Sequence, residues 1–340
     1  MRRALLLLAA AGALSAGSLS GQGSVPRYSS EPVRYQNPND STVLTGSLFL
    51  PPGRGPFGGV VLMSIAGTDP IVERLTELSF AVLVPIRRGF VSVEPLLQST
   101  YQELADDGAA AVAYLRARPD VADERVTLIG QNDDAPPAIM AAAQSPTPIP
   151  LVLLAPPGFI GRELFRLEQH GLAERRGVSA RELDVLDLYV DAISAIILKE
   201  VSPYMRAYRM EEMMAETEVE LPYNAAFPDD EGRIHFFSAP LWYDRISFDP
   251  AKALAQLHGP VLLLIGQEDP DTPLDRYLPT VQGALAIAPT KDATVCVVLE
   301  RTRHSFNEVT VGVIGTWVRD RDAGRATAVS GCLREPEEKR

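Results

Sequence analysis

Residues 125–144 constrain the fold more than any other part of the chain. Residues 126–129 form a short β-branched and aliphatic run, with charge before it and a turn after it, which is typical of a fully buried strand. Gly130 begins a sharp turn. Residues 135–144 then continue as a helix, with two prolines in the first turn, where a missing backbone N–H costs little. This pattern predicts a buried strand that turns directly into a helix.

Short apolar runs and helical patterns alternate along most of the chain. Further strands are predicted at residues 43–50, 59–63, 81–85, 151–154, 261–265 and 294–299. Helical spacing predicts helices at residues 71–78, 98–118, 274–287 and 308–319. Strands separated by helices imply βαβ crossovers, and therefore a mostly parallel sheet that is covered by helices on both faces.

A different pattern begins at residue 158. The predicted helices there are rich in Met and charge, with no core-type strand between them, and span residues 163–170, 180–201 and 205–217. We interpret this part as a helical cap inserted over the edge of the sheet. Its methionines form either a pliable apolar pocket or a helix-packing core. In chain order, we expect a signal peptide at residues 1–20, a first core part at 21–157, the cap at 158–238, a second core part at 239–321 and a C-terminal tail at 322–340.

Charge and the N-terminal pattern limit the partners and the location. A net charge of -12 argues against nucleic acid, because phosphate binding needs clustered Lys and Arg. Arg2 and Arg3 precede an apolar run at residues 4–14 and a series of small residues, which predicts a secretory signal peptide and a secreted or periplasmic location. That run is too short to span a membrane, and no later stretch is long enough. Residues 21–39 are polar and are expected to form an extended arm.

Cys296 and Cys332 are the two cysteines of the chain. In an oxidising compartment, a disulfide between them would tie the C-terminal tail to a late strand. Two buried free thiols would give the same sequence, so both alternatives stay open. No C-x-x-C or His/Cys cluster indicates a metal site, and no cofactor is expected.

Segments over almost the whole mature length resemble bacterial α/β-hydrolases of the serine aminopeptidase-like or dienelactone hydrolase-like group. The segment FGGVVLMSIAGTDP resembles the family's strand and oxyanion loop, and ELSFAVLVPIRRGF resembles its next strand and the Arg- and Gly-bearing loop that follows. The segment YQELADDGAAAVAYLRARPDVADERVTLIG resembles the helix and strand that lead to the nucleophile. The segment FDPAKALAQLHGPVLLLIGQEDPDTP resembles the part that leads to the catalytic acid. The resemblance implies the α/β-hydrolase fold, a mostly parallel doubly wound sheet with an inserted helical cap.

The resemblance also implies candidate site residues. The family's nucleophile turn reads G-x-S-x-G, and residues 130–134 read GQNDD, so Asn132 stands at the nucleophile position. Asp269 falls on the catalytic acid and His304 on the general base, in the chain order of the family. In that role Asp269 orients His304 and stabilises its protonated form. The oxyanion and binding positions fall on Ile65, Ala66 and Asp133.

Neighbouring residues of the same types are weaker candidates. Asp271 is an alternative acid that fits the spacing less well than Asp269. The other histidines lie in the predicted cap or at helix ends, without a comparable context, and are His170, His235 and His258.

Two departures from the family concern catalysis itself. A histidine cannot activate the neutral amide of Asn132 as a nucleophile. In the same turn, Asp134 stands where the family has glycine. The second departure is in the oxyanion loop, where Ser64 and Ile65 replace His-Gly. A β-branched residue at that loop presents its backbone N–H only if the local backbone angles suit it.

Three interpretations follow from these departures. We favour a non-catalytic or altered hydrolase fold that binds a small apolar or ester-like ligand, or a partner, in the cap cleft. The second is an active ester, thioester or peptide hydrolase with a displaced nucleophile, for which the candidates are Asp133, Asp134 and Ser64. The third is an active esterase or peptidase with its nucleophile turn elsewhere, although the chain has no other G-x-S-x-G.

Overall fold

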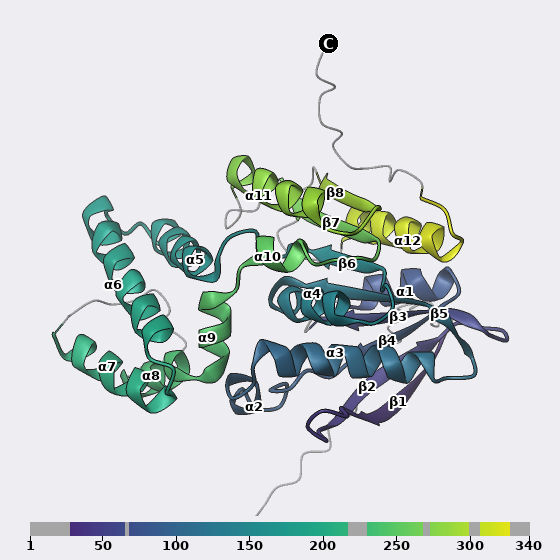
Figure 1. Cartoon of the computed structure of the whole chain (residues 1–340), viewed down its shortest axis with the longest axis horizontal. Coiled ribbons are helices and arrows are strands. Elements are labelled where there is room, and N and C mark those ends of the chain that lie inside the picture. Colours follow the sequence, from purple (N-terminus) through teal and green to yellow (C-terminus); the bar gives the residue numbers. More distant parts are fainter. Residues whose placement is uncertain (1–27, 65–67, 217–229, 268–272, 299–306, 327–340) are drawn as a thin grey trace, which may run out of the picture.

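A sheet of eight strands runs through the centre of the molecule, in the order β1-β2-β4-β3-β5-β6-β7-β8 (Figure 1). This computed structural model describes residues 28–64, 68–216, 230–267, 273–298 and 307–326. The strands from β3 to β8 are parallel, whereas β1 and β2 form an antiparallel edge. The prediction of a mostly parallel sheet is therefore confirmed.

The strands follow the apolar runs of the sequence. They are β1 (Ser29–Gln36), β2 (Val43–Leu50), β3 (Phe57–Met63), β4 (Phe80–Pro85), β5 (Val121–Gln131), β6 (Leu151–Leu154), β7 (Val261–Gly266) and β8 (Ala293–Val298). All residues of β6 and β7 are buried, because parallel strands in the middle of a sheet are covered on both faces.

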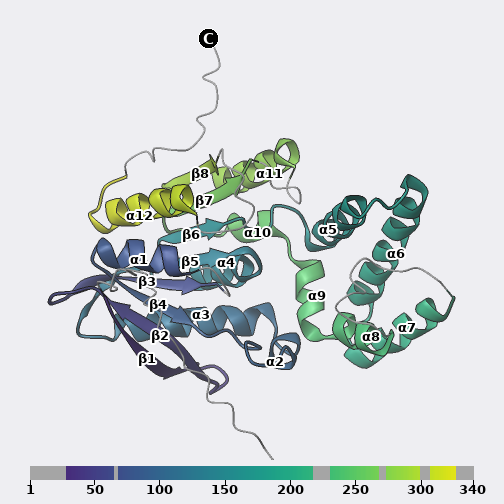
Figure 2. The ribbon, with the colours of Figure 1, turned by 180° about the vertical axis from the view of Figure 1, so that it is seen from behind.

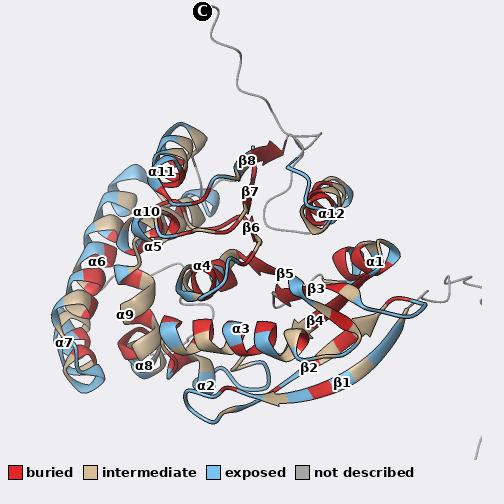
Figure 3. Ribbon diagram, turned by 45° about the vertical axis from the view of Figure 1, so that its right-hand side comes forward, coloured by how far each residue is buried: buried red, intermediate tan, exposed pale blue. Residues whose placement is uncertain are grey.

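Helices cover both faces of the sheet (Figures 2 and 3). One face packs against α1 (Asp69–Glu77) and α12 (Glu308–Asp322). The other packs against α3 (Tyr101–Arg116), α4 (Ala135–Gln144), α10 (Pro250–Leu254) and α11 (Leu274–Ile287). Leu128 of β5 belongs to the cluster under α3 and α4, and the next residue, Ile129, belongs to the cluster under α1 and α12. Successive side chains of a strand point to opposite faces, so this alternation agrees with the prediction that residues 126–129 form a fully buried strand.

A purely helical segment lies between β6 and α10. Its helices are α5 (Gly161–Arg175), α6 (Ala180–Lys199), α7 (Pro203–Glu216), α8 (Asp230–Ser238) and α9 (Pro240–Ser247), and we call them together the helical segment. They lie beyond one end of the sheet (Figures 1 and 2). The helical segment has its own apolar core, in which aromatic rings pack with centroids 4.8 to 5.7 Å apart, from Phe165, Phe236, Phe237 and Trp242. Met210 is fully buried there, which fits the helix-packing alternative for this methionine.

Some elements escape the sequence patterns. Part of the expected polar arm, residues 29–36, is the edge strand β1, which pairs along its length with β2. Only Val33 of β1 is buried, because an edge strand covers few side chains, and the apolar alternation is correspondingly weak. The short helix α2 (Glu94–Leu97) and the helices α8, α9 and α10 were also not predicted. Within the described ranges, no helix is both long and apolar enough to cross a membrane.

Cys296 lies in β8, where it is fully buried and disulfide-bonded. Cys332 lies outside the described residues. The free-thiol alternative is therefore wrong for Cys296.

Candidate functional site

The predicted site lies where parallel strands end. In open α/β sheets, ligands bind beyond the carboxyl ends of the strands, and β5 leads there directly into Asn132 and Asp133. The other predicted site residues, Ile65, Ala66, Asp269 and His304, lie outside the described residues. Their proximity to Asn132 stays a prediction.

Residues 130–134, which we call the elbow, form a sharp turn from strand to helix. β5 ends at Gln131, one turn of 3-10 helix covers Asn132–Asp134, and α4 begins at the next residue. Asn132 has a φ of 50°, in the left-handed region that Asn tolerates better than most residues. A Cβ on Gly130 would lie 2.6 Å from the Cβ of Ala138, so only glycine lets β5 approach α4 this closely. Asn132 is therefore the apex of a tight turn.

The side-chain oxygen of Asn132 is buried and has no hydrogen-bond partner in the described part of the chain. Leaving a buried acceptor unsatisfied costs about 1–3 kcal/mol, and native proteins do so rarely. An amide oxygen accepts hydrogen bonds but does not attack a substrate carbon in the way that an activated serine does. The apex of the elbow thus carries a buried amide acceptor that no donor in the described residues satisfies.

Asp133 connects the elbow to the helical segment. Arg245 of α9 donates a hydrogen bond to Asp133, and its Nη2 donates to both carboxylate oxygens of Glu168 on α5, at 2.9 and 3.0 Å. The guanidinium carbon of Arg245 also lies 5.4 Å from the ring centre of Trp242, a cation–π distance. The Arg245 and Glu168 side chains are 18% and 22% exposed, so water screens their ion pair less than a surface ion pair, whereas the Asp133 side chain is 59% exposed.

A second polar contact attaches α9 to the sheet core. The Oδ2 of Asp244 accepts a hydrogen bond from the backbone N–H of Tyr101, the first residue of α3, at 2.6 Å. A carboxylate at a helix N-terminus is favourable because the N–H groups there lack partners within the helix. Burial nevertheless raises the pKa of Asp244. The side chains of α9 that reach the sheet core in these two contacts, Arg245 and Asp244, are therefore both ionisable.

Asp134 forms a buried ion pair beside the elbow. Its carboxylate accepts a hydrogen bond from Nη1 of Arg87 at 3.0 Å, and the Asp134 side chain is 5% exposed. Burial raises the pKa of Asp134, and the charge of Arg87 opposes that effect. Because Arg87 follows β4 closely, the pair links the ends of two strands.

Ser64 lies next to the elbow on the adjacent strand. The register of β3 with β5 pairs Met63 with Gly130, which places Ser64 beside Gln131. The hydroxyl of Ser64 donates to the side-chain oxygen of Gln131, in a buried contact. An amide oxygen does not take up the proton, so this contact does not activate the hydroxyl.

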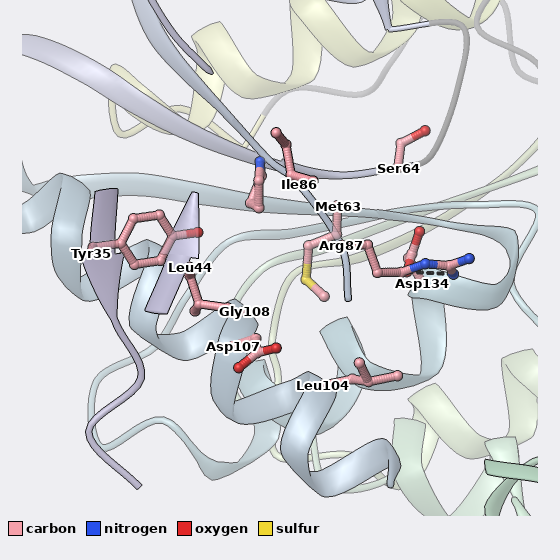
Figure 4. A pocket seen from close by; sticks show the side chains of 11 residues that line it. Tyr35, Leu44, Met63, Ser64, Ile86, Arg87, Leu104, Asp107, Gly108 and Asp134 are labelled. Atoms are coloured by element: carbon pink, nitrogen blue, oxygen red, sulfur yellow. Dashed lines mark hydrogen bonds and ion pairs between the residues drawn. The ribbon is translucent and has the colours of Figure 1, made fainter. Parts of the chain in front are cut away.

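A small cavity lies beside the elbow (Figure 4). Its volume is about 30 Å³, which holds one or two water molecules. The residues that line it include Tyr35, Leu44, Met63, Ile86, Leu104 and Asp134. The hydroxyl of Tyr35 is buried there, without a hydrogen-bond partner among the described residues, and burial raises its pKa.

Ion pairs fix the segment between β4 and α3. Arg88 donates to Asp107 of α3 at 2.6 and 2.7 Å and to Asp40 at 2.6 Å. Further along, Nε2 of His235 on α8 lies 2.8 Å from a carboxylate oxygen of Glu94 on α2. Leu97 of α2 is buried in the core of the helical segment.

Sequence reasoning missed Arg245, Asp244 and the pairing of Arg87. Arg245 is 112 positions from Asp133 along the chain and belongs to no motif, so no sequence signal links them. Arg87, in contrast, lies in the family-like loop RRGF. In the parts of the chain that are described, no group of three or more His, Cys, Asp or Glu side chains is arranged to hold a metal ion.

Comparisons with known proteins agree with this architecture. A scan against protein-family models found no match, and a search of the curated proteins found none either. Among solved structures, 2,6-dihydroxy-pseudo-oxynicotine hydrolase is 14% identical, with a TM-score of 0.54 over 89% of this chain and 70% of that chain. The α/β-hydrolase GrgF from Penicillium sp. sh18 is 14% identical, with a TM-score of 0.53 over 87% and 99%. Acetyl xylan esterase 1 from Thermoanaerobacterium sp. JW/SL YS485 is 13% identical, with a TM-score of 0.51 over 87% and 84%.

At these identities the similarity concerns the fold alone. The strand order, the parallel sheet with helices on both faces and the structural neighbours agree. The chain has the α/β-hydrolase fold, as its sequence segments predict.

Proposed function

We propose that this protein is a non-catalytic member of the α/β-hydrolase fold class that binds a small apolar or ester-like ligand between the helical segment and the elbow. The observation that carries the proposal is Asn132 at the apex of the elbow. The tight turn that would expose a nucleophile is present, with a φ of 50°, but its side chain is an amide. A protein can keep a ligand-binding site after it has lost catalytic activity, because one fold supports sites of different chemistry.

The unsatisfied oxygen of Asn132 supports a binding role. A ligand that donates an N–H or O–H to this oxygen would remove the cost of leaving a buried acceptor unpaired. Asp269 and His304 would lie around the same ligand and bind it, rather than transfer protons. The helical segment acts as the cap in this proposal, since Arg245 attaches it to Asp133 of the elbow.

An active hydrolase with a displaced nucleophile is the alternative, and the contacts of its three candidates disfavour it. Asp133 is held by Arg245, and Asp134 is buried and paired with Arg87. Burial also raises the pKa of Asp134, which favours its neutral and less nucleophilic form. Ser64 donates its hydroxyl to Gln131, which is not a base.

The experiment is a reaction of the purified protein with a fluorophosphonate probe and a panel of p-nitrophenyl esters. We expect neither labelling nor turnover above the rate of a buffer control. Hydrolysis that disappears in His304→Ala would contradict the proposal. Asn132→Ser is the matched gain-of-function variant, because it restores a hydroxyl at the apex. Activity that appears only in Asn132→Ser would mean that the surrounding geometry is intact and that only the nucleophile is lost.

The N-terminal prediction enters the proposal as well. We expect the mature protein to be exported, with cleavage after Ala16 or Ser20, and its disulfide to form from Cys296 and Cys332 in the oxidising compartment. Intact-mass measurement of exported protein, with and without reductant, checks both the cleavage position and the absence of free thiols.

A further inference from the structure

We infer that the ligand carries a flexible apolar chain and that the loop between β4 and α2 binds this chain. The inference rests on the proposed function, since it concerns the same site. Four large apolar side chains of this loop are exposed to solvent: Ile86 by 44%, Phe90 by 68%, Val91 by 98% and Val93 by 48%. We call these four side chains the apolar strip. Single exposed apolar residues are normal on a protein surface, but four within eight positions indicate a binding surface.

Ion pairs and a tight turn hold the loop that carries the apolar strip in one conformation. Arg88, inside the loop, is held by Asp107 and Asp40. Gly89 has a φ of 82°, and a Cβ there would lie 2.5 Å from the Cβ of Leu96, so the loop turns sharply at this glycine. The backbone N–H of Phe90 donates to the carbonyl of Arg87 and closes the turn. A loop that is held in this way presents its apolar side chains in advance, which lowers the entropy lost on binding.

The two ends of the loop lie at the two sides of the proposed site. At its beginning, Arg87 is paired with Asp134 of the elbow. Just after its end, Glu94 contacts His235 of the helical segment. The apolar strip begins at the cavity beside the elbow, because Ile86 lines this cavity. A ligand with its polar end at Asn132 would therefore find apolar surface along this loop.

The size and charge of the surface favour a ligand chain over other occupants. Four side chains supply roughly a few hundred Å² of apolar surface, whereas a specific protein–protein interface buries about 800 Å² on each partner. Anionic membranes attract clustered Lys and Arg, but this chain has a net charge of -12. The two arginines of the loop are already paired with carboxylates. An alkyl chain of a small amphiphile is the occupant that fits.

The experiment measures how affinity depends on chain length. Dansyl amides with n-butyl, n-octyl and n-dodecyl chains are titrated into the mature protein and followed by dansyl fluorescence. Burial of one methylene corresponds to about a fourfold gain in affinity, so we expect the dissociation constant to fall about two- to fourfold per methylene that reaches the strip. The double variant Phe90→Ser, Val91→Ser should weaken dodecyl binding at least tenfold and leave butyl binding unchanged.

The matched control is Val185→Ser with Leu188→Ser, which removes two exposed apolar side chains from α6. It should keep the full dependence on chain length. A chain-length dependence that persists in the Phe90 and Val91 variant, or equal affinities for the three probes, would overturn the inference. The inference would also be overturned if the wild-type protein sedimented as a dimer, or together with phosphatidylcholine vesicles, and the Phe90 and Val91 variant did not.

Asn132→Trp separates this inference from the proposed function, because the indole would fill the space at the elbow. If all three probes bind Asn132→Trp and wild type equally, the ligand does not lie at the elbow and the proposed function fails. If Asn132→Trp abolishes binding while the Phe90 and Val91 variant does not flatten the chain-length dependence, the proposed site stands and only the role of the apolar strip fails.

Discussion

Leu128 and Ile129 of β5 pack into apolar clusters on opposite faces of the sheet, whereas α9 contacts the sheet core through charged side chains. Apolar burial is non-directional and large, about 1.5–3 kcal/mol for one side chain, and it holds the sheet and its helices as one unit. The bridges made by Arg245 and Asp244 are directional and involve few atoms. Leu164 and Leu167 of α5 also pack against the sheet core, so the contact between the two regions is partly apolar. We expect the helical segment to loosen before the sheet core unfolds, as binding under a cap requires, because each region has an apolar core of its own.

The two tryptophans allow this comparison to be measured. Trp317 of α12 is fully buried against the sheet, and Trp242 of α9 is buried in the core of the helical segment. Variants that keep only one of them, made by Trp→Phe substitution, report on each region separately.

The largest effects are expected from apolar truncations in each region. Leu128→Ala should lower the free energy of unfolding by about 2–5 kcal/mol, because it creates a cavity in the sheet core. It should shift the urea transitions of both tryptophans, because the helical segment is attached to that core. Ile193→Ala on α6 should shift mainly the transition of Trp242. Fluorescence of the two single-tryptophan proteins in urea checks this. Coincident shifts for Ile193→Ala would mean that the molecule unfolds as one unit.

A smaller effect is expected from the bridge at the elbow. Arg245→Met keeps much of the side-chain volume but removes the cation between Glu168 and Asp133, and should destabilise the helical segment by about 1 kcal/mol, mainly through the partly buried Glu168. The Trp242 transition should move and the Trp317 transition should not. Arg209→Met, which breaks an exposed pair with Glu212 on α7, is the control and should change neither transition. An equal response to both variants would contradict the bridging role of Arg245.

Substitutions at the apex of the elbow test how the turn at the end of β5 contributes to the stability of the sheet core. Asn132→Val should destabilise the protein by about 1–2 kcal/mol, because a β-branched residue is strained at a φ of 50°. Asn132→Gly should be nearly neutral, because glycine adopts this conformation freely. The Trp317 transition in urea measures both. If valine and glycine behave alike, the apex is not held in the left-handed conformation in solution.

The smallest effect is a dependence of stability on pH. Burial raises the folded-state pKa of Asp134 above its ordinary value, so the folded protein binds this proton more tightly than the unfolded chain. Stability from this group is therefore greatest below about pH 4 and falls as the pH rises through the folded pKa. Asp134→Asn should flatten that part of the curve in urea unfolding between pH 3.5 and about 8. A steeper fall in the variant would reverse the sign assigned to the group.

Much of the sheet could be predicted because each central strand is a continuous apolar run. Strands β2 and β6 were predicted at their observed bounds, and so were helices α4 and α11. Edge strand β1 was not, since it buries only Val33 and the pattern is too weak. The elbow could be predicted from Gly130 and the following helix, but the partners of Asp133 and Asp134 could not, because ion pairs between distant residues leave no periodic trace in a sequence.

Local residue types and spacing were enough to predict a mostly parallel sheet, the tight turn and the amide at its apex, and the family resemblance implied the α/β-hydrolase fold. Which charged side chains meet at the elbow became evident only from the folded chain. It brought Arg245 of α9 to Asp133, Arg87 to Asp134 and Ser64 to Gln131. These contacts depend on how strands and helices pack, which is set by long-range burial rather than by any local pattern.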